Sequence, residues 1–196
     1  MEKTFIAATG NAHKLVELRR ILEPHGFKVE PATKEMLKGI VEDGTTFEEN
    51  SLIKARHVHE LTGLPTIADD SGISFDYLNG LPGIYSARFL GEDTPYSIIN
   101  AQVLKILENV PLEKRGAHYT CVISIVTDKG EYTFDGIFEG HVGFTPKGTN
   151  GFGYDPIFCL SDGRSVAELP DGEKDKMSHR GKALEKLEEN FSSIEF

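Results

Sequence analysis

Three observations predict a single globular domain, over all 196 residues, that contains both strands and helices. The length falls within the roughly 100–200 residues common for one domain. Hydrophobic residues make up 39% of the sequence, and 20 glycines bring the apolar share to that of an ordinary globular protein. Apolar residues recur at strand spacing in some segments and at helical spacing in others, without an internal repeat or a low-complexity tract. A disordered chain, a collagen and a coiled coil are excluded.

Near its start the sequence has the pattern of a strand, a tight turn and a helix. Residues 4–8 form a short apolar run typical of a buried strand. Residues 9–11 follow as a turn, because Gly and Asn favour tight turns. Leucines then recur at helical spacing until Pro24 interrupts the pattern: Leu15, Leu18 and Leu22.

Three further helices are predicted from their start signals and apolar faces. Thr46, followed three residues later by Glu49, makes a capping box that marks the start of the second helix. The third helix is expected to begin at Pro95, since proline is favoured at the first helical position, and to end near Val110. The last helix carries an apolar face: Ala183, Leu184, Leu187 and Phe191.

Two adjacent carboxylates interrupt an apolar stretch in the first half of the chain. Residues 66–68 are typical of a buried strand, and residues 73–75 alternate as in a half-buried strand. The residues between them, 69–72, are turn formers, so we expect the strand to break there. Asp69 and Asp70 are therefore expected in a turn between two strands.

The next strands are predicted to form a hairpin. Residues 119–127 and 131–139 have strand patterns, and the turn-forming segment 128–130 joins them. A third strand is expected near Val142. After a glycine-rich loop, residues 156–158 return to a strand.

Charge and cysteine content narrow the class of partner and the compartment. Asp and Glu total 31 against 21 Lys and Arg, and the net charge of -10 disfavours a nucleic-acid polymer or an anionic membrane as partner. Cys121 and Cys159 lie in apolar runs without the spacing of a zinc site, so we interpret them as buried thiols. No apolar stretch reaches the roughly 18 residues of a membrane span, and we expect a cytoplasmic protein.

The turn at the end of the first strand is the first candidate site. Residues 9–14 lead into a helix whose free N–H groups and positive dipole end suit a phosphate, and Lys14 adds a cation. The same residues also fit an ordinary strand-to-helix turn with an exposed lysine. Neither a GxxxxGKS/T nor a GxGxxG motif is present, so the two best-defined nucleotide fingerprints are missing.

Asp69 and Asp70 form the second candidate site, for a divalent cation. Adjacent carboxylates repel each other, and a metal such as Mg²⁺ or a water-filled cleft would take up their charge. Glu42 could supply a further metal ligand and Lys54 a further phosphate contact. A solvated turn explains the two aspartates equally well, and helical surface charge explains Glu42 and Lys54.

Two later stretches contain residues suited to a planar base. Glycines in the loop 151–155 permit close approach of the backbone, and its two aromatics offer flat faces. Asp155 could accept from ring or exocyclic N–H groups. The run 174–180 is cationic in an otherwise acidic chain. A loop with its aromatics folded into the core and an ordinary charged surface are the alternatives.

Six motifs occur in order along nearly the whole chain. They are Thr9-Gly10-Asn11-x-x-Lys14, Phe47-x-x-Asn50 with Lys54-Ala55, Ala68-Asp69-Asp70-Ser71-Gly72, Leu81-Pro82-Gly83, Gly151-Phe152-Gly153-Tyr154-Asp155-Pro156 and Ser178-His179-Arg180. In this order the sequence resembles the inosine triphosphate pyrophosphatase family. No departure from the family pattern removes one of its site residues.

The resemblance implies an α/β fold: an elongated mixed β-sheet flanked by helices, in two lobes with a nucleotide cleft between them. It also implies a homodimer and Mg²⁺ as the cofactor. The implied activity is hydrolysis of non-canonical purine nucleoside triphosphates (ITP, dITP and XTP) to the nucleoside monophosphate and pyrophosphate, which cleanses the nucleotide pool.

The resemblance assigns roles by position in the sequence. Asp70 matches a metal ligand and the proposed general base, and Glu42 matches a second metal ligand. Asp69, next to Asp70, is expected to orient the attacking water. The residues that match substrate-binding positions are Thr9, Gly10, Asn11, Lys14, Lys54, Ser71, Phe152, Gly153, Tyr154, Asp155, Lys174, His179 and Arg180.

Two other functions fit parts of the same pattern. A pyrophosphatase of similar architecture could act on the standard nucleotides, and it would differ in the residues that read the base. A binding-only nucleotide sensor would keep the pocket without turnover. Adjacent carboxylates argue against the sensor, because they repel a tetra-anionic ligand unless a metal intervenes.

Overall fold

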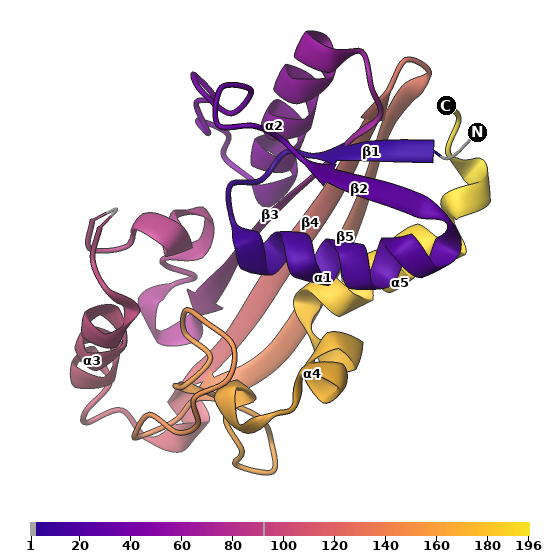
Figure 1. The fold of residues 1–196 in the computed structure, drawn as a ribbon. Coiled ribbons are helices and arrows are strands. Elements are labelled where there is room, and N and C mark those ends of the chain that lie inside the picture. The colour runs from indigo at the N-terminus through magenta and orange to yellow at the C-terminus, as the bar shows by residue number, and fades with distance from the viewer. Residues whose placement is uncertain (1–2, 92) are drawn as a thin grey trace. The chain divides into compact units, whose positions relative to one another are not determined.

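A computed structural model of the protein describes residues 3–91 and 93–196. Within these residues six strands form one sheet in the order β2-β1-β3-β4-β5-β6 (Figure 1). The strands are β1 (Lys3–Ala7), β2 (Phe27–Pro31), β3 (Thr66–Phe75), β4 (Gly116–Thr127), β5 (Gly130–Val142) and β6 (Phe158–Cys159). The α-helices are α1 (Ala12–Leu22), α2 (Phe47–Thr62), α3 (Tyr96–Ile106), α4 (Asp171–Met177) and α5 (His179–Glu189). β1 pairs in parallel with β2 and β3, whereas β5 and β6 are antiparallel, so the expected mixed α/β fold is confirmed.

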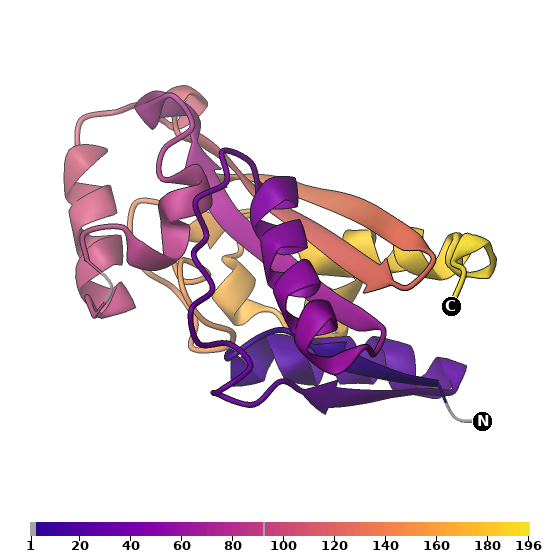
Figure 2. The same cartoon turned by 90° about the horizontal axis from the view of Figure 1, so that it is seen from above.

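The described residues form two compact units. The first unit contains the described residues up to Asp70, Cys121–Gly136 and Ala183–Phe196. The second unit contains Ser71–Thr120 and Ile137–Lys182. Strands β3, β4 and β5 each contribute residues to both units. Figure 2 shows β4 and β5 joined as a hairpin, which confirms the hairpin expected from the sequence.

In the first unit, the alternation of side chains along β3 separates two apolar clusters. Successive side chains of a strand point to opposite faces. Ile67 packs in one cluster with Leu18 of α1 and Leu184 of α5, two helices that lie side by side in Figure 1. Ala68 packs in the other cluster with Val58 of α2. Helices α1 and α5 therefore cover one face of this part of the strand, and α2 covers the other.

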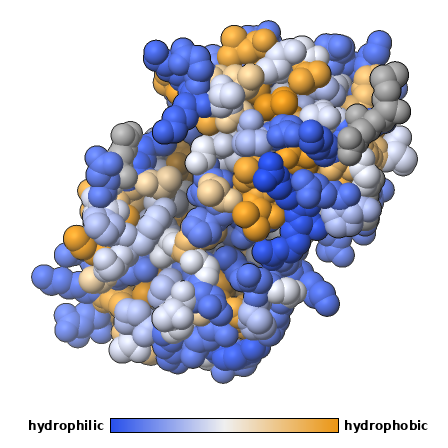
Figure 3. Space-filling model, in the orientation of Figure 1, coloured by the Kyte–Doolittle hydropathy of each residue, from blue (hydrophilic) through white to orange (hydrophobic). Residues whose placement is uncertain are grey.

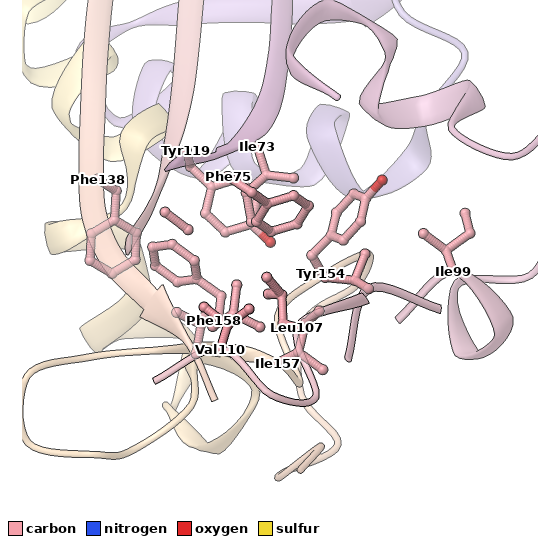
Figure 4. Packing of buried hydrophobic residues seen from close by; sticks show 14 of the residues in the cluster. Ile73, Phe75, Ile99, Leu107, Val110, Tyr119, Phe138, Tyr154, Ile157 and Phe158 are labelled. Atoms are coloured by element: carbon pink, nitrogen blue, oxygen red, sulfur yellow. The ribbon is translucent and has the colours of Figure 1, made fainter. Parts of the chain in front are cut away.

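The core of the second unit is rich in aromatic side chains (Figure 4). The ring centroid of Phe158 lies 4.7 Å from that of Tyr119 and 5.3 Å from that of Phe138. Tyr154 lies edge-on to Phe75 at 5.9 Å. Tilted and edge-on ring pairs contribute beyond the area that they bury. These contacts anchor the loop before β6 to β3 through Tyr154, and β6 itself to β4 and β5 through Phe158.

The surface and the cysteines agree with the composition. Hydrophilic residues cover most of the face drawn in Figure 3, with apolar residues scattered among them. Within residues 3–91 and 93–196, no helix is long and apolar enough to cross a membrane. Cys121 and Cys159 are buried free thiols, as the sequence predicted.

The expected break at residues 69–72 is wrong, since β3 is one continuous strand. Asp69 and Asp70 are buried within it, and each is ion-paired with a lysine from a helix. The composition suggested a break because Asp, Ser and Gly are depleted in strands or favour turns. The ion pairs remove the need for these carboxylates to reach water, so the strand continues.

Two other expectations are corrected in detail. Val142 is the last residue of β5 and pairs with Phe158 of β6, so it does not form a third strand of its own. Helix α3 ends at Ile106 rather than near Val110. The physical reason is that Pro111 has no N–H to donate to the carbonyl of Leu107, which accepts from Arg115 instead.

A buried arginine holds one end of the second unit together. Arg115 is 1% exposed, and its guanidinium donates to carbonyls of two segments. On the β5 side it donates to Val142 at 2.8 Å and to Gly143 at 2.6 Å. After α3 it donates to Leu107 and, at 3.4 Å, to Val110. A single side chain therefore satisfies four backbone acceptors that have little access to water.

We expect Arg115→Met to lower the free energy of unfolding by about 2–3 kcal/mol, because it leaves buried carbonyls without a donor. Arg56→Met is the matched control, since it removes an exposed ion pair with Glu131 at 2.6 Å and should cost less than about 1 kcal/mol. Urea unfolding of both variants measures the difference. Equal losses would contradict the role given to Arg115.

Candidate functional site

The turn before α1 is held by its own side chains. Asn11 caps the helix, because its Oδ1 atom accepts from the backbone N–H groups of His13 at 2.9 Å and Lys14 at 3.3 Å. Thr9 Oγ1 in turn accepts from the N–H of Asn11 at 3.1 Å. The first turn of α1 contains no acidic residue. The positive end of the helix dipole is therefore not compensated by a carboxylate of that turn.

Asp69 lies on the face of β3 that α1 covers. Its side chain is fully buried, and its Oδ2 atom lies 3.1 Å from Lys14 Nζ. The thiol of Cys121 donates to the same oxygen at 3.9 Å. Because an uncompensated buried carboxylate is strongly destabilising, the ammonium of Lys14 makes this burial possible.

Asp70 belongs to a second cluster, with two residues from other segments. Lys54, in α2, donates from Nζ to Asp70 Oδ1 at 3.0 Å. The same ammonium donates to Glu42 Oε2 at 2.9 Å. Helix α2 begins after Thr46, whose side chain accepts from the N–H of Glu49, whereas the Glu49 carboxylate accepts from the N–H of Thr45 rather than that of Thr46. The cap and the apolar face of α2 thus fix the position of Lys54.

Burial and charge act in opposite directions on this cluster. Burial raises the pKa of Asp70 above its usual value, although the neighbouring Lys54 ammonium opposes the shift. Burial by itself would lower the pKa of Lys54, but the carboxylates of Asp70 and Glu42 outweigh it and raise that pKa. One ammonium shared by two carboxylates does not fully offset the burial of Asp70. Lys54 therefore stays charged, and Asp70 becomes a stronger proton acceptor.

Asp70 and Glu42 fit a divalent cation as an open pair of carboxylates. The Oδ2 atom of Asp70 is buried and accepts no hydrogen bond from any described residue. The Lys54 ammonium shows that a cation can bridge the two carboxylates. Mg²⁺ is usually held by one or two carboxylates together with substrate phosphates. No closed set of three or more His, Cys, Asp or Glu side chains around a metal occurs in the part of the chain that the structure describes.

The adjacency of Asp69 and Asp70 in the sequence suggested that they share one cation. In the structure they do not. They point to opposite faces of β3, and each has its own lysine. The role of Asp69 in orienting the water stays a prediction, and in the structure its carboxylate is paired with Lys14.

In the second unit, the carboxylate of Asp155 is the centre of a hydrogen-bond network. Its Oδ2 atom accepts from Lys174 Nζ and from the backbone N–H of Phe152, both at 3.0 Å. Its Oδ1 atom accepts from the hydroxyl of Tyr119 at 3.1 Å. Gly151 has φ +73, and a Cβ atom there would lie 2.1 Å from Asp155 Oδ2. Only glycine lets the loop close this tightly around the carboxylate.

The two aromatics of this loop have different environments. Phe152 is partly exposed, and Lys174 Nζ lies 5.0 Å from its ring centroid. Tyr154 is buried, donates to the carbonyl of Ser86 at 2.9 Å and packs at 5.3 Å from Tyr96. Tyr154 therefore supports the loop from the core, whereas the Phe152 side chain is partly exposed.

The cationic run brings two further side chains to this unit. The His179 ring stacks on Tyr119, with a centroid distance of 4.7 Å and an interplanar angle of 11°. Arg180 donates from Nη2 to Ser71 Oγ at 3.2 Å. Both residues are buried, and they begin α5 directly after Ser178, the residue that caps the end of α4. The run is therefore not an ordinary charged surface.

Sequence reasoning missed two residues that contact these clusters. Tyr119 and Cys121 follow the alternation of an ordinary strand, and nothing near them in the sequence marks a site. The only signal was that Tyr119 falls at a position of the strand where the side chain is buried. A buried phenol hydroxyl needs a hydrogen-bond partner. The partner, Asp155, is distant in the sequence and could not be predicted.

A surface pocket of ≈ 410 Å³ in the first unit contains none of the candidate residues. Four of the side chains that line it form two close pairs. Arg56 binds Glu131 at 2.6 Å, and His59 Nε2 lies 3.4 Å from Asp128. The pocket is therefore not part of the candidate site.

The candidate residues thus form a separate group in each unit. The first unit contributes the positive end of α1, two partly buried ammonium groups and three carboxylates, a set that suits phosphates and a divalent cation. The second unit contributes cationic donors and a partly exposed ring, a set that suits a planar heterocycle.

Comparison with known proteins gives consistent matches over the whole chain. Residues 5–190 match the model of the Ham1 family. The chain is 44% identical to the dITP/XTP pyrophosphatase of Vibrio cholerae, over 98% of this chain and 97% of that protein. It is 45% identical to the dITP/XTP pyrophosphatase of Bacillus licheniformis, over 94% and 96% of the two chains. The structure of a HAM1 protein from Coxiella burnetii matches with a TM-score of 0.89 at 39% identity, over 98% of this chain and 100% of that chain.

Proposed function

The chain belongs to the Ham1 family, and on this basis we propose that it hydrolyses non-canonical purine nucleoside triphosphates, with ITP, dITP and XTP as substrates, to the monophosphate and pyrophosphate. Relatives 44% and 45% identical to it are dITP/XTP pyrophosphatases. In the structure, the cluster of Lys54 with Asp70 and Glu42 carries the proposal. It combines a cation for phosphate with carboxylates for a metal and for proton transfer.

Triphosphate binding is assigned to the first unit. Lys14 and Lys54 supply ammonium groups, and the turn formed by Thr9, Gly10 and Asn11 lies at the positive end of α1. These groups can replace the water around a highly charged anion. The net charge of -10 does not oppose such a ligand, because the local charge of a site governs binding there.

Mg²⁺ is proposed to bind at Asp70 and Glu42. When bound, it would act as a Lewis acid that stabilises negative charge developing on the phosphates. Lys54 would then exchange Asp70 for a phosphate oxygen. Asp70 is the proposed general base, since burial raises its pKa towards the range in which a carboxylate can take a proton from water.

Recognition of the base is assigned to the second unit. Hypoxanthine and xanthine have a carbonyl at the purine 6 position, where adenine has an amino group. Arg180 is purely a donor and His179 can donate beside it, so the pair favours a carbonyl. Phe152 offers its ring, with Lys174 near its centroid. Asp155 already accepts three hydrogen bonds, and its part is to hold Phe152 and Lys174 in place.

The same proposal includes a homodimer, which the family resemblance of the motifs supports. It also includes a cytoplasmic location, which the buried free thiols support. Ser71 and the backbone of Gly153 are proposed to line the base and sugar positions. The hydrogen bond from Arg180 to Ser71 supports this role for Ser71.

Two other functions compete with this proposal: a sensor without turnover, and an enzyme for the standard nucleotides. One assay separates them.

The test is a panel of nucleoside triphosphates with Mg²⁺, scored separately for pyrophosphate and orthophosphate. We expect dITP, ITP and XTP to be cleaved with a kcat/KM about 10²–10⁴-fold above that for dATP. The amino group of adenine cannot accept a hydrogen bond from the buried donors at the purine 6 position, and donors left without an acceptor give discrimination of this order. In ¹⁸O-labelled water, the label should enter the monophosphate, because water attacks the α-phosphorus. Orthophosphate as the first product, or equal rates on all bases, would contradict the proposal.

The metal assignment predicts the effect of Asp70→Asn. This change should lower kcat by about 10²–10⁴-fold, because it removes a metal ligand and the proton acceptor together. EDTA should have the same effect on the unaltered protein.

Asp76→Asn is the control, since Asp76 is an exposed aspartate 4.0 Å from His118. It should leave kcat within about twofold, as expected for an exposed and weak pair. Thermal unfolding should confirm that both variants are folded. Normal turnover of folded Asp70→Asn with Mg²⁺ would refute the assignment.

A further inference from the structure

Tyr119 connects two stretches that are far apart in the sequence, the loop that contains Asp155 and the start of α5. It lies in β4 and is 8% exposed. In Figure 4 its ring lies among the aromatic side chains of the second unit, at 4.7 Å from Phe158. Two contacts go beyond this packing: the hydroxyl donates to Asp155, and the ring face stacks on His179.

The hydroxyl contact acts on the whole loop. Asp155 receives Lys174 and the N–H of Phe152 on one carboxylate oxygen and Tyr119 on the other. A carboxylate held on both oxygens has a fixed orientation, whereas one held on a single oxygen can rotate about its Cβ–Cγ bond. The Tyr119 hydroxyl therefore fixes the direction in which Asp155 presents Phe152 and Lys174.

The stacking contact acts on the other stretch. The planes of Tyr119 and His179 differ by 11°, so the imidazole lies flat on the phenol ring. This contact restricts rotation of the His179 side chain, and both rings are buried. The next residue, Arg180, is tied separately to Ser71. Tyr119 thus sets the orientation of His179 relative to the Asp155 loop.

We propose that Tyr119 is a positioning residue that determines selectivity for 6-oxopurine over 6-aminopurine nucleotides. The inference rests on the proposed function. It adds Tyr119 to the residues that govern recognition of the base, although Tyr119 does not itself contact the base. Selectivity requires the donors near the 6 position and the flat face of Phe152 to hold one mutual geometry. Tyr119 contacts both groups through a single rigid ring.

A purely structural role makes a different prediction. If Tyr119 only filled the core, phenylalanine would keep the stack on His179 and the packing against Phe158. Tyr119→Phe would then lower stability slightly and leave the ratio of activities between bases unchanged. The hydroxyl is the part of the side chain that separates the two roles.

The experiment compares kcat and KM for dITP and dATP in the full-length protein and three variants. Tyr119→Phe removes only the hydroxyl, and Tyr119→Leu removes the stack as well. Tyr132→Phe is the matched control, because it also removes a phenol hydroxyl that is hydrogen-bonded, here to the N–H of Glu195 at 3.0 Å.

We expect Tyr119→Phe to raise the KM for dITP about tenfold with little change in kcat, and to narrow the dITP to dATP ratio by a similar factor. A tenfold change matches the loss of one hydrogen bond to a charged group. Tyr119→Leu should narrow the ratio further. Tyr132→Phe should change neither KM nor the ratio.

Two results would overturn the inference. One is a dITP to dATP ratio in Tyr119→Phe equal to that of the unaltered protein. The other is an equal fall of kcat on both nucleotides, which would mean a structural role. If the unaltered protein does not prefer dITP, the proposed function itself fails, and this outcome is visible before any variant is compared.

Discussion

The structure depends on the burial of two consecutive carboxylates, Asp69 and Asp70, in the middle of one strand. Strand geometry sends them to opposite faces, so one residue cannot neutralise both. Lys14 of α1 meets Asp69 on one face, and Lys54 of α2 meets Asp70 on the other. Loss of one partner would leave a buried charge uncompensated, which costs several kcal/mol. The positions of both helices against β3 are therefore fixed by charge as well as by apolar packing.

This arrangement explains how an acidic protein can offer a site for an anion. Lys14 and Lys54 enter the fold as partners of buried carboxylates, and in the proposed reaction the same ammonium groups serve the triphosphate. Asp70 is less fully compensated than Asp69, since it shares the ammonium of Lys54 with Glu42. The carboxylate with the weaker compensation is the one proposed for metal binding and proton transfer.

Local patterns allowed the sequence to predict α1, α2, α3, α5 and the hairpin, but they missed α4 and β2 and did not show how the candidate residues pair. The helix start at Thr46 is a short-range feature and is confirmed, since Thr46 accepts from the N–H of Glu49. The other half of the expected capping box is not formed, because the Glu49 carboxylate accepts from Thr45 instead. The break at residues 69–72 was wrong because turn propensity is local, whereas the lysines that allow burial come from distant helices. Tyr119 was missed for the same reason, since its partners Asp155 and His179 are distant in the sequence.

The most direct test is a set of double-mutant cycles on stability, with Lys14→Met, Lys54→Met, Asp69→Asn and Asp70→Asn. Urea unfolding gives the coupling energy of each lysine with each aspartate. Opposite-face burial predicts a coupling of about 1–3 kcal/mol for Lys14 with Asp69 and for Lys54 with Asp70, and a several-fold smaller coupling for the crossed pairs. Crossed pairs that couple as strongly as the direct pairs would contradict the account, because they would place both carboxylates in one shared site.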